Sequence, residues 1–185
     1  KEAIICIGTG KSQVPILSEA KKLNYFVIGI DQNQESEGVS YCDISIRQST
    51  HNAPAIIKEI EKIFSSNKKE FFKIGIINRS SGIPVITTSI LSDFLGIPNL
   101  SQKNAETTVN KDKLREFCFK TGIPIPKYQN FSIKHKFEAI PFDLPFIVKP
   151  ALSFVGKSGI SIVKKKSEFL NSIKHASKFT ENKKS

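Results

Sequence analysis

A regular alternation of short β-branched runs with helical patterns constrains the fold of residues 1–100 more than any other feature of the sequence. An apolar run at Ala3–Ile7 is followed by Gly8-Thr9-Gly10, by a helical pattern over Pro15–Leu23 and by a second apolar run at Tyr25–Ile30. Two strands joined through a helix within about 30 residues lie parallel, with a right-handed crossover. The pattern therefore predicts an open, mostly parallel α/β sheet of the Rossmann-like kind.

The alternation continues to residue 100 and then changes. The further elements expected in the first part are strands at Tyr41–Ile46 and Phe71–Ile77 and helices at Ala53–Phe64 and Val85–Leu95, the last ending at Gly96. Those expected afterwards are a helix at Lys111–Thr121 capped by Asn110, strands at Lys127–Ile133, Phe146–Pro150 and Gly159–Val163, and a helix at Ser167–Ala176. The last two strands flank a Ser/Gly-containing loop, which predicts an antiparallel pair. We therefore expect two domains, 1–100 and 101–185.

Positive charge is concentrated in the second of these parts. The chain has 185 residues and a net charge of +11, of which +1 comes from residues 1–100 and +10 from residues 101–185. Such a difference indicates two modules with different partners. The basic part suits nucleic acid, nucleotide phosphates or an acidic protein surface.

Several classes of protein are excluded by the composition. No apolar run approaches the ~18 residues that a membrane-spanning helix needs, so we expect no membrane partner. The three cysteines, Cys6, Cys42 and Cys118, are far apart and form no Cys-x-x-Cys pair, which argues against a metal site and favours reduced thiols in a cytoplasmic protein. The absence of methionine and the ending soon after a helical pattern lead us to expect part of a longer product.

The first glycine-containing turn, Gly8-Thr9-Gly10, follows a predicted strand. A dinucleotide-binding fingerprint needs a third glycine where this chain has Gln13, although Asp31 fits the acidic residue of that motif. The pattern favours a turn whose backbone N–H groups face a small molecule over an NAD or FAD site. Asn78-Arg79 follows another predicted strand, so we expect Gly8, Gly10, Asn78 and Arg79 to bind substrate together at the carboxyl edge of the sheet.

The second loop, Ala151–Ser158, resembles a P-loop in composition but not in context. A P-loop passes from a strand into a helix, whereas a β-branched run, Gly159–Val163, follows here. The loop nevertheless comes directly after Lys149-Pro150, and its backbone N–H groups together with Lys149 and Lys157 suit phosphate oxygens. The plain alternative is a surface hairpin with solvated lysines.

The order of these segments resembles the N-terminal part of ATP-grasp enzymes. Asn110–Arg115, its helix and Gly122–Pro126 resemble the segment that opens that fold, and Phe146–Pro150, the loop and Gly159–Val163 resemble its first strand pair. Gly96–Ser101 resembles the junction before it. The branch of closest resemblance is that of the carbamoyl-phosphate synthase large subunit and biotin carboxylase. The resemblance implies a Rossmann-like, pre-ATP-grasp domain followed by the first, smaller α+β subdomain of an ATP-grasp fold.

The resemblance also assigns binding residues. Lys113 resembles the first phosphate-binding lysine of the family, and Lys149 resembles the lysine that contacts the α- and β-phosphates of ATP. Gly156, Lys157, Ser158 and Gly159 resemble the loop that folds over the phosphates, although this loop has fewer glycines and is one residue longer. The adenine-binding hinge and the Mg²⁺ ligands of the family belong to a later portion, so we assign no metal ligand and no catalytic residue here.

The implied function is that of an ATP-dependent ligase that acts on a small carboxylate through an acylphosphate, with ATP and Mg²⁺ as cofactors. This chain would be its N-terminal fragment, inactive by itself, and a homodimer or a partner subunit stays open. One alternative is a non-catalytic nucleotide or small-molecule binding module. Another is a nucleic-acid-binding protein, which is disfavoured because the lysines of residues 101–185 lack an interleaved aromatic set and only Arg115 supplies a guanidinium there.

Overall fold

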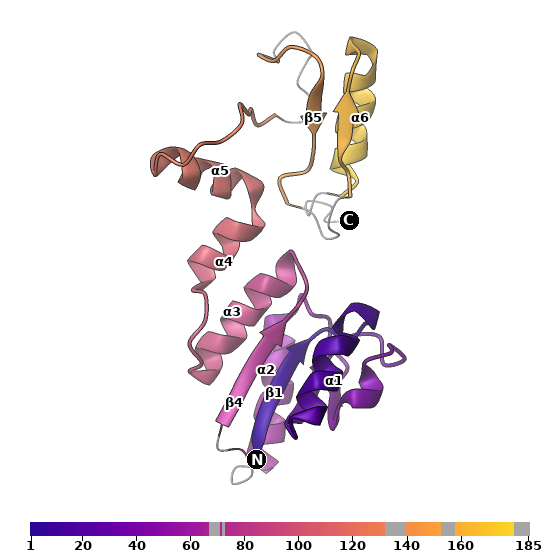
Figure 1. Cartoon of the computed structure of the whole chain (residues 1–185), viewed down its shortest axis with the longest axis vertical. Coiled ribbons are helices and arrows are strands. Elements are labelled where there is room, and N and C mark those ends of the chain that lie inside the picture. The colour runs from indigo at the N-terminus through magenta and orange to yellow at the C-terminus, as the bar shows by residue number, and fades with distance from the viewer. Residues whose placement is uncertain (67–70, 72, 132–139, 153–157, 180–185) are drawn as a thin grey trace. The chain divides into compact units, whose positions relative to one another are not determined.

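The computed structural model describes residues 1–66, 71, 73–131, 140–152 and 158–179 of the chain (Figure 1). The chain divides into two compact units, Lys1–Ala105 and Glu106–Ser185, called here the first unit and the second unit. The assignment of residues 1–100 and 101–185 to separate functional domains stays a prediction. In the described residues, no helix has the length and apolar character needed to cross a membrane.

The first unit is built on a four-stranded sheet with the strand order β3-β2-β1-β4. Its strands are β1 (Glu2–Ile7), β2 (Phe26–Ile30), β3 (Ile44–Ile46) and β4 (Lys73–Asn78). Every pairing is parallel, and Ile5 of β1 lies opposite Ile28 on one side and Ile76 on the other. Parallel neighbours require crossover connections. The helix α1 (Val14–Lys22) connects β1 to β2, and α2 (Ala53–Ser66) connects β3 to β4, whereas β2 and β3 are joined by a segment that contains a 3₁₀ turn. The helix α3 (Ile83–Leu95) follows β4.

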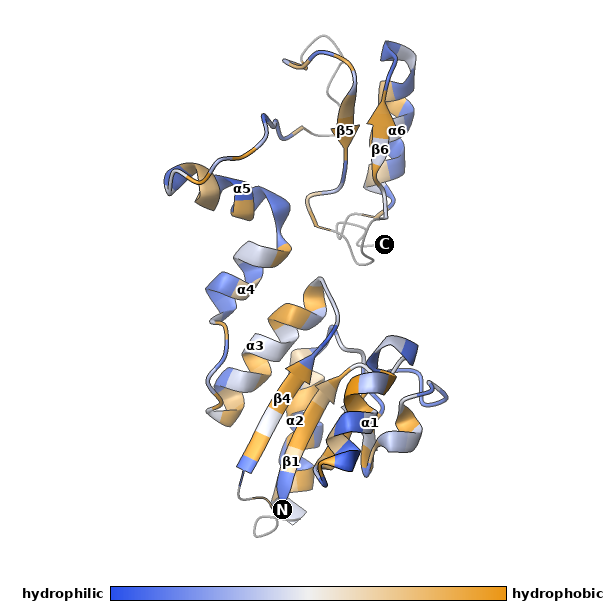
Figure 2. Ribbon diagram, viewed as in Figure 1, coloured by the Kyte–Doolittle hydropathy of each residue, from blue (hydrophilic) through white to orange (hydrophobic). Residues whose placement is uncertain are grey.

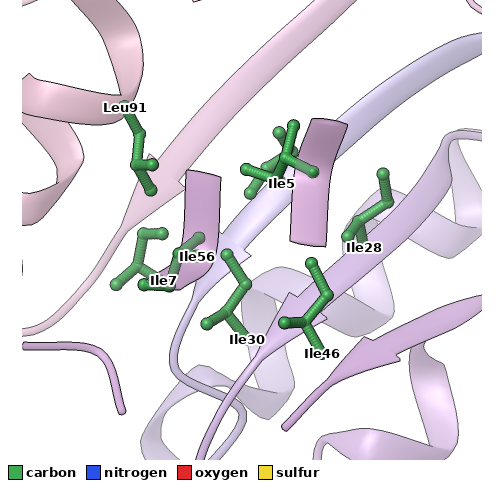
Figure 3. Packing of buried hydrophobic residues seen from close by; sticks show 8 residues of the cluster. Ile5, Ile7, Ile28, Ile30, Ile46, Ile56 and Leu91 are labelled. Atoms are coloured by element: carbon green, nitrogen blue, oxygen red, sulfur yellow. The ribbon is translucent and has the colours of Figure 1, made fainter. Parts of the chain in front are cut away.

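Both faces of this sheet are covered, which explains why its strands are apolar almost without interruption. One face forms a cluster with α2 and α3 that includes Ile5, Ile28, Ile56 and Leu91, and Figure 3 shows these side chains meeting. The other face packs on α1 through a second cluster that includes Leu17. Figure 2 shows β1 and β4 as mainly apolar ribbons. Each fully buried isoleucine or leucine contributes about 1.5–3 kcal/mol from its burial.

The predicted strand at Tyr41–Ile46 is correct only at its end. Val39–Tyr41 forms a 3₁₀ turn, and β3 begins at Ile44. The backbone N–H of Gly38 donates to the carbonyl oxygen of Thr9 at 2.7 Å, which holds this turn beneath the loop after β1. The carboxylate of Asp43 then accepts the backbone N–H of Val27 at 2.7 Å. These tertiary hydrogen bonds, which a local pattern does not reveal, shorten the strand.

The second unit contains a helix, a two-stranded sheet and a further helix. They are α5 (Lys111–Lys120), β5 (Phe146–Val148), β6 (Ser161–Val163) and α6 (Phe169–Ser177). The strands β5 and β6 are antiparallel, with Ile147 opposite Ile162, as the sequence predicts. Phe169 and Ile173 of α6 pack against Val148 and Val163 to form the core of this unit.

Two other expectations differ from the structure. The helix α4 (Gln102–Val109) is not predicted, because its only buried side chain is Ala105 and it therefore lacks an apolar stripe. The strand predicted at Lys127–Ile133 is wrong for residues 127–131, which are extended without strand pairing, and residues 132–133 lie outside the described part. Side chains of this segment line a cavity that is described below. Its β-like composition therefore belongs to a cavity wall and not to a strand of a sheet.

Asn110 caps α5, as the sequence predicts. Its Oδ1 accepts the backbone N–H groups of Asp112 at 2.9 Å and Lys113 at 3.2 Å, so two of the four unpaired donors at the helix start are satisfied. Asn110→Ala is expected to destabilise α5 by about 1 kcal/mol. Amide hydrogen exchange at residues 112–116 should then become about fivefold faster, whereas Asn110→Asp should preserve protection. Unchanged exchange in Asn110→Ala would contradict the capping role.

Candidate functional site

The turn after β1 is folded over the carboxyl end of β2. Gly8 has a φ of +94°, which favours glycine, and its N–H donates to the carbonyl oxygen of Ile30 at 2.8 Å. The N–H of Thr9 donates to Asp31 Oδ2 at 2.9 Å, and Oδ1 of the same carboxylate accepts the N–H of Asn33 at 2.9 Å. Asp31 therefore organises the backbone of two loops. This structural role explains an acidic residue directly after β2, and it does not require a dinucleotide.

Asn78 and Arg79 lie beside this turn, as expected. Asn78 ends β4 directly opposite Ile7, and Arg79 Nη1 donates to the carbonyl oxygen of Ser12. Gln13 Nε2 also donates to Ser80 Oγ at 3.1 Å, which adds a second link between the two loops. The predicted juxtaposition of Gly8-Thr9-Gly10 with Asn78-Arg79 is thus confirmed, and their role in binding substrate stays a prediction.

Sequence reasoning missed the role of Gln13 and Ser80 at this edge of the sheet. Gln13 attracts notice in the sequence only because it replaces a glycine. In the structure its side chain is buried and lies near Gly8, where an added Cβ would come within 3.4 Å of Gln13 Nε2. The buried amide of Gln13 therefore packs against the turn after β1, at the position where the dinucleotide fingerprint has its third glycine.

A cavity of about 560 Å³ opens within the second unit. Its lining comes from α5, from the extended segment 126–131, and from β5 with the residues that follow it. Four cationic and two acidic side chains take part, and these are Lys111, Arg115, Lys127, Lys149, Asp112 and Asp143. Apolar rings, including those of Phe131 and Phe146, form much of the remaining wall. A concave, largely apolar site with a few converging charges is the usual form of a small-molecule site.

The helix α5 presents Lys111 and Arg115 to this cavity because residues four apart share one face of a helix. The N–H of Lys111 donates to the carbonyl oxygen of Ala151 at 3.0 Å, which ties the start of the helix to the loop after β5. Lys113 lies two residues along, does not line the cavity, and forms an ion pair with Glu106 at 2.7 Å. The structure therefore brings Lys111 and Lys149 to one cavity. Lys113, which the family resemblance indicates as the first phosphate-binding lysine, does not line it.

Lys149 lies at the end of β5 and lines the same cavity. Although it remains accessible to solvent, its pKa is lowered, first by partial burial and then by the positive charges of Arg115 and Lys111. Burial also lowers the pKa of Lys111, and the charge of Asp112 opposes that shift. In the described part of the chain, no carboxylate lies within ion-pair distance of Lys111, Arg115 or Lys149. A bound anion would relieve the repulsion among these cations.

The loop predicted to cover phosphates is described only at its end. Gly156 and Lys157 lie outside the described residues, whereas Ser158 and Gly159 lie within them. Gly159 is buried with a φ of +73°, and an added Cβ would lie 3.0 Å from Phe179 Cδ2 and 3.2 Å from Pro150 Cδ. Glycine is thus required there for packing, and the phosphate contacts of all four residues stay predictions.

The basic run Lys164-Lys165-Lys166 lies in a solvent-exposed turn between β6 and α6. The carboxylate of Glu168 accepts the N–H groups of Lys164 at 2.7 Å and Lys165 at 3.1 Å, so the side chain of Glu168 organises this turn. These two hydrogen bonds hold the pKa of Glu168 below its usual value. The run therefore has a local structural explanation that involves no nucleic acid.

The described side chains indicate no metal site, and two of the three thiols are unreactive. Within residues 1–66, 71, 73–131, 140–152 and 158–179, no three His, Cys, Asp or Glu side chains gather in a way that could hold a metal ion. Burial raises the pKa of Cys6 to about 12 and that of Cys42 to about 11, so both remain protonated at neutral pH.

Comparisons with known proteins reveal the same architecture in a group of enzymes. No family model matches the chain. Formate-dependent phosphoribosylglycinamide formyltransferase of Prochlorococcus marinus strain MIT 9312 is 27% identical over 175 residues, which cover 91% of this chain and 41% of that protein. The ADP complex of an N5-carboxyaminoimidazole ribonucleotide synthetase superposes with a TM-score of 0.71 at 17% identity, over 96% of this chain and 44% of the other.

A third relative is the biotin carboxylase domain of the 2-oxoglutarate carboxylase of Hydrogenobacter thermophilus, whose structure contains MgADP. It matches with a TM-score of 0.63 at 16% identity, over 96% of this chain and 41% of the other. The chain thus spans less than half the length of these relatives and has the fold of their N-terminal region. The predicted fold class, a parallel α/β sheet followed by a small α+β part, is confirmed.

Proposed function

We propose that this chain, which has the fold of the N-terminal region of the ATP-grasp superfamily, provides phosphate-binding groups to an ATP-dependent ligase. The observation that carries this proposal is the convergence of Lys111 and Lys149 on one cavity without a carboxylate partner in the described residues. Both of the solved structures described above contain ADP, one of them with magnesium. The oxygen atoms of a polyphosphate chain are the natural partners for such paired ammonium groups.

Lys111, rather than Lys113, is the first phosphate-binding lysine in this proposal. Lys111 starts α5 and lines the cavity, whereas the ammonium group of Lys113 is already engaged with Glu106. Lys149 supplies the second ammonium group from the end of β5, where the buried Pro150 fixes the following backbone. Gly156, Lys157, Ser158 and Gly159 then cover the phosphates.

The proposed reaction has two steps. An oxygen of a small carboxylate attacks the γ-phosphorus of ATP, the bond to the bridging oxygen breaks, and ADP and an acylphosphate form. A nucleophile then attacks the acyl carbon and displaces inorganic phosphate. Lys111 and Lys149 hold the phosphate chain and stabilise the negative charge that moves onto its oxygens. Magnesium would add to that stabilisation when bound, and among the described residues no three His, Cys, Asp or Glu side chains gather to hold it.

The turn Gly8-Thr9-Gly10, at the carboxyl ends of the strands in the first unit, is the proposed site for the substrates. Open α/β sheets bind ligands outside the carboxyl ends of their strands, and Gly8, Gly10, Asn78 and Arg79 gather there. The name of the Prochlorococcus relative specifies formate, which is a small carboxylate, and a phosphorylated glycinamide. Because the chain matches less than half of that relative, the complete reaction is proposed for an enzyme in which further residues supply the remaining groups.

Substitution of Lys149 tests the phosphate-binding role. Lys149→Ala is expected to weaken ATP binding by about 1–3 kcal/mol, the free energy of a hydrogen bond to a charged group. Lys164→Ala is the matched control, because Lys164 is an exposed lysine at the end of the paired strand β6. Calorimetric titration of ATP into the chain and both variants provides the measurement. Equal affinities for the two variants would exclude Lys149 from the phosphate site.

A further inference from the structure

We propose that Arg115 is a third anion-binding group of the cavity in the second unit and that Tyr128 is the residue that positions it. The proposal rests on the proposed function, because it extends the set of groups that bind the phosphate chain of a nucleotide. It assigns a role to the one arginine of residues 101–185, which lines the cavity together with Lys111 and Lys149.

The guanidinium of Arg115 is held by two contacts from the extended segment 126–131. Its Cζ lies 5.1 Å from the centroid of the Tyr128 ring, in a cation–π arrangement. Its Nη1 donates to the carbonyl oxygen of Pro126 at 3.4 Å. A guanidinium carries five N–H donors in a rigid plane, so contact through one face and one donor leaves others for a ligand. Such a fixed fork matches two oxygens of a phosphate group at once.

The surroundings of Arg115 differ from those of two other cations on the same helix. Lys113 pairs with Glu106 at 2.7 Å and Lys120 pairs with Glu116 at 2.6 Å. In the described residues Arg115 forms no ion pair and lies close enough to Lys149 to contribute to the lowered pKa of that lysine. These three neighbouring cations have no carboxylate within ion-pair distance in the described residues, so they repel one another. Binding of a polyanion relieves that repulsion.

A second observation in the same cavity indicates a ligand. Gln129, which follows Tyr128 and lines the cavity, has a buried Oε1 without a hydrogen-bond partner in the structure as described. A buried acceptor without a partner is unfavourable, so it points to a ligand that supplies an N–H or O–H group. A nucleotide satisfies both requirements, because it combines a polyanionic chain with hydroxyl and amino donors.

The test compares five variants of the chain in titrations with ATP and with sodium tripolyphosphate, which lacks the nucleoside. Arg115→Ala is expected to lower the affinity for both probes about tenfold. Arg115→Lys should recover only part of that loss, because an ammonium group lacks the planar fork. Tyr128→Phe should bind as the parent chain does, and Tyr128→Ala should lose about threefold. Lys120→Ala, on the same helix outside the cavity, should change neither affinity.

The positioning role of Tyr128 is measured by a double-mutant cycle. If Tyr128 acts by holding Arg115, then Tyr128→Ala should cause no further loss of affinity in a chain that already carries Arg115→Ala. Additive losses would overturn the positioning role. Far-UV circular dichroism verifies that each variant is folded, and Arg115→Gln, which keeps a good helix former, replaces Arg115→Ala if that variant unfolds.

The outcomes separate this proposal from the proposed function. If Arg115→Ala binds both probes as tightly as the parent chain while Lys149→Ala binds them more weakly, Arg115 is not an anion-binding group and the proposed function is retained. If the parent chain binds neither ATP nor tripolyphosphate at millimolar concentrations, both are overturned. Weakening of tripolyphosphate binding in Arg115→Ala at constant ionic strength supports the assignment of Arg115.

Discussion

Phe169→Ala is expected to destabilise the second unit by about 3–5 kcal/mol, the range for truncating a buried phenylalanine. Phe169 begins α6 and is fully buried, and its ring lies 5.7 Å from the ring of Phe131 and 6.1 Å from that of Phe146. The strands β5 and β6 have only three residues each, and a two-stranded sheet of that length is marginal without a helix packed on it. The substitution therefore removes the side chain that joins the sheet to α6.

Leu170→Ala is the matched control for this substitution. Leu170 is the next residue of the same helix and is 56% exposed, so its truncation should change stability by less than about 0.5 kcal/mol. Amide hydrogen exchange of residues 146–148 and 161–163 reports the stability of the sheet directly. Phe131 and Phe146 also line the cavity, so Phe169→Ala should weaken ATP binding as well. If the amides of the two strands exchange equally slowly in Phe169→Ala and Leu170→Ala, Phe169 is not central to this core.

Gly38→Ala is expected to destabilise the first unit by about 3 kcal/mol, the upper part of the range for overpacking. A Cβ at residue 38 would lie 2.5 Å from the carbonyl oxygen of Thr9 and 2.6 Å from Leu17 Cδ1. The carbonyl oxygen belongs to the backbone and cannot turn aside. It also accepts the N–H of Gly38 at 2.7 Å, so any displacement lengthens that hydrogen bond. The loss should appear as a lower urea midpoint in far-UV circular dichroism.

Gly75→Ala provides the comparison for Gly38→Ala. Gly75 lies in β4, and an added Cβ there would meet no atom closer than 3.9 Å. Because alanine restricts the unfolded chain more than glycine does, this variant should be as stable as the parent or up to about 1 kcal/mol more stable. An equal loss in both variants would show that the close approach of residue 38 to Thr9 is not the cause.

The turn around Thr9 connects this packing to the proposed substrate site. Thr9 Oγ1 lies 2.6 Å from Ser36 Oγ, so the segment that contains Gly38 supports the turn through a side chain as well as through the backbone. Displacement of residue 38 should therefore disturb the turn at Gly8 and Gly10.

The sequence by itself determined the parallel sheet of the first unit and the antiparallel pair of the second. The sheet is predictable because strands that are buried on both faces are apolar throughout, and helical patterns separate β1 from β2 and β3 from β4. The start of α5 is predictable because an asparagine side chain caps a helix locally. The position of Lys149 follows from its place at the end of an apolar run.

Only the tertiary structure decided which cations share the cavity. Spacing along α5 shows that Lys111 and Arg115 lie on one face and Lys113 on another, but it does not reveal which face meets β5. That choice depends on contacts between residues far apart in the chain, such as the hydrogen bond from Lys111 to Ala151 and the approach of Arg115 to Tyr128. The same holds for the shortened strand β3, which depends on the hydrogen bond between Gly38 and Thr9. Local patterns encode which face of an element is apolar, whereas the pairing of polar groups is settled only when the elements pack together.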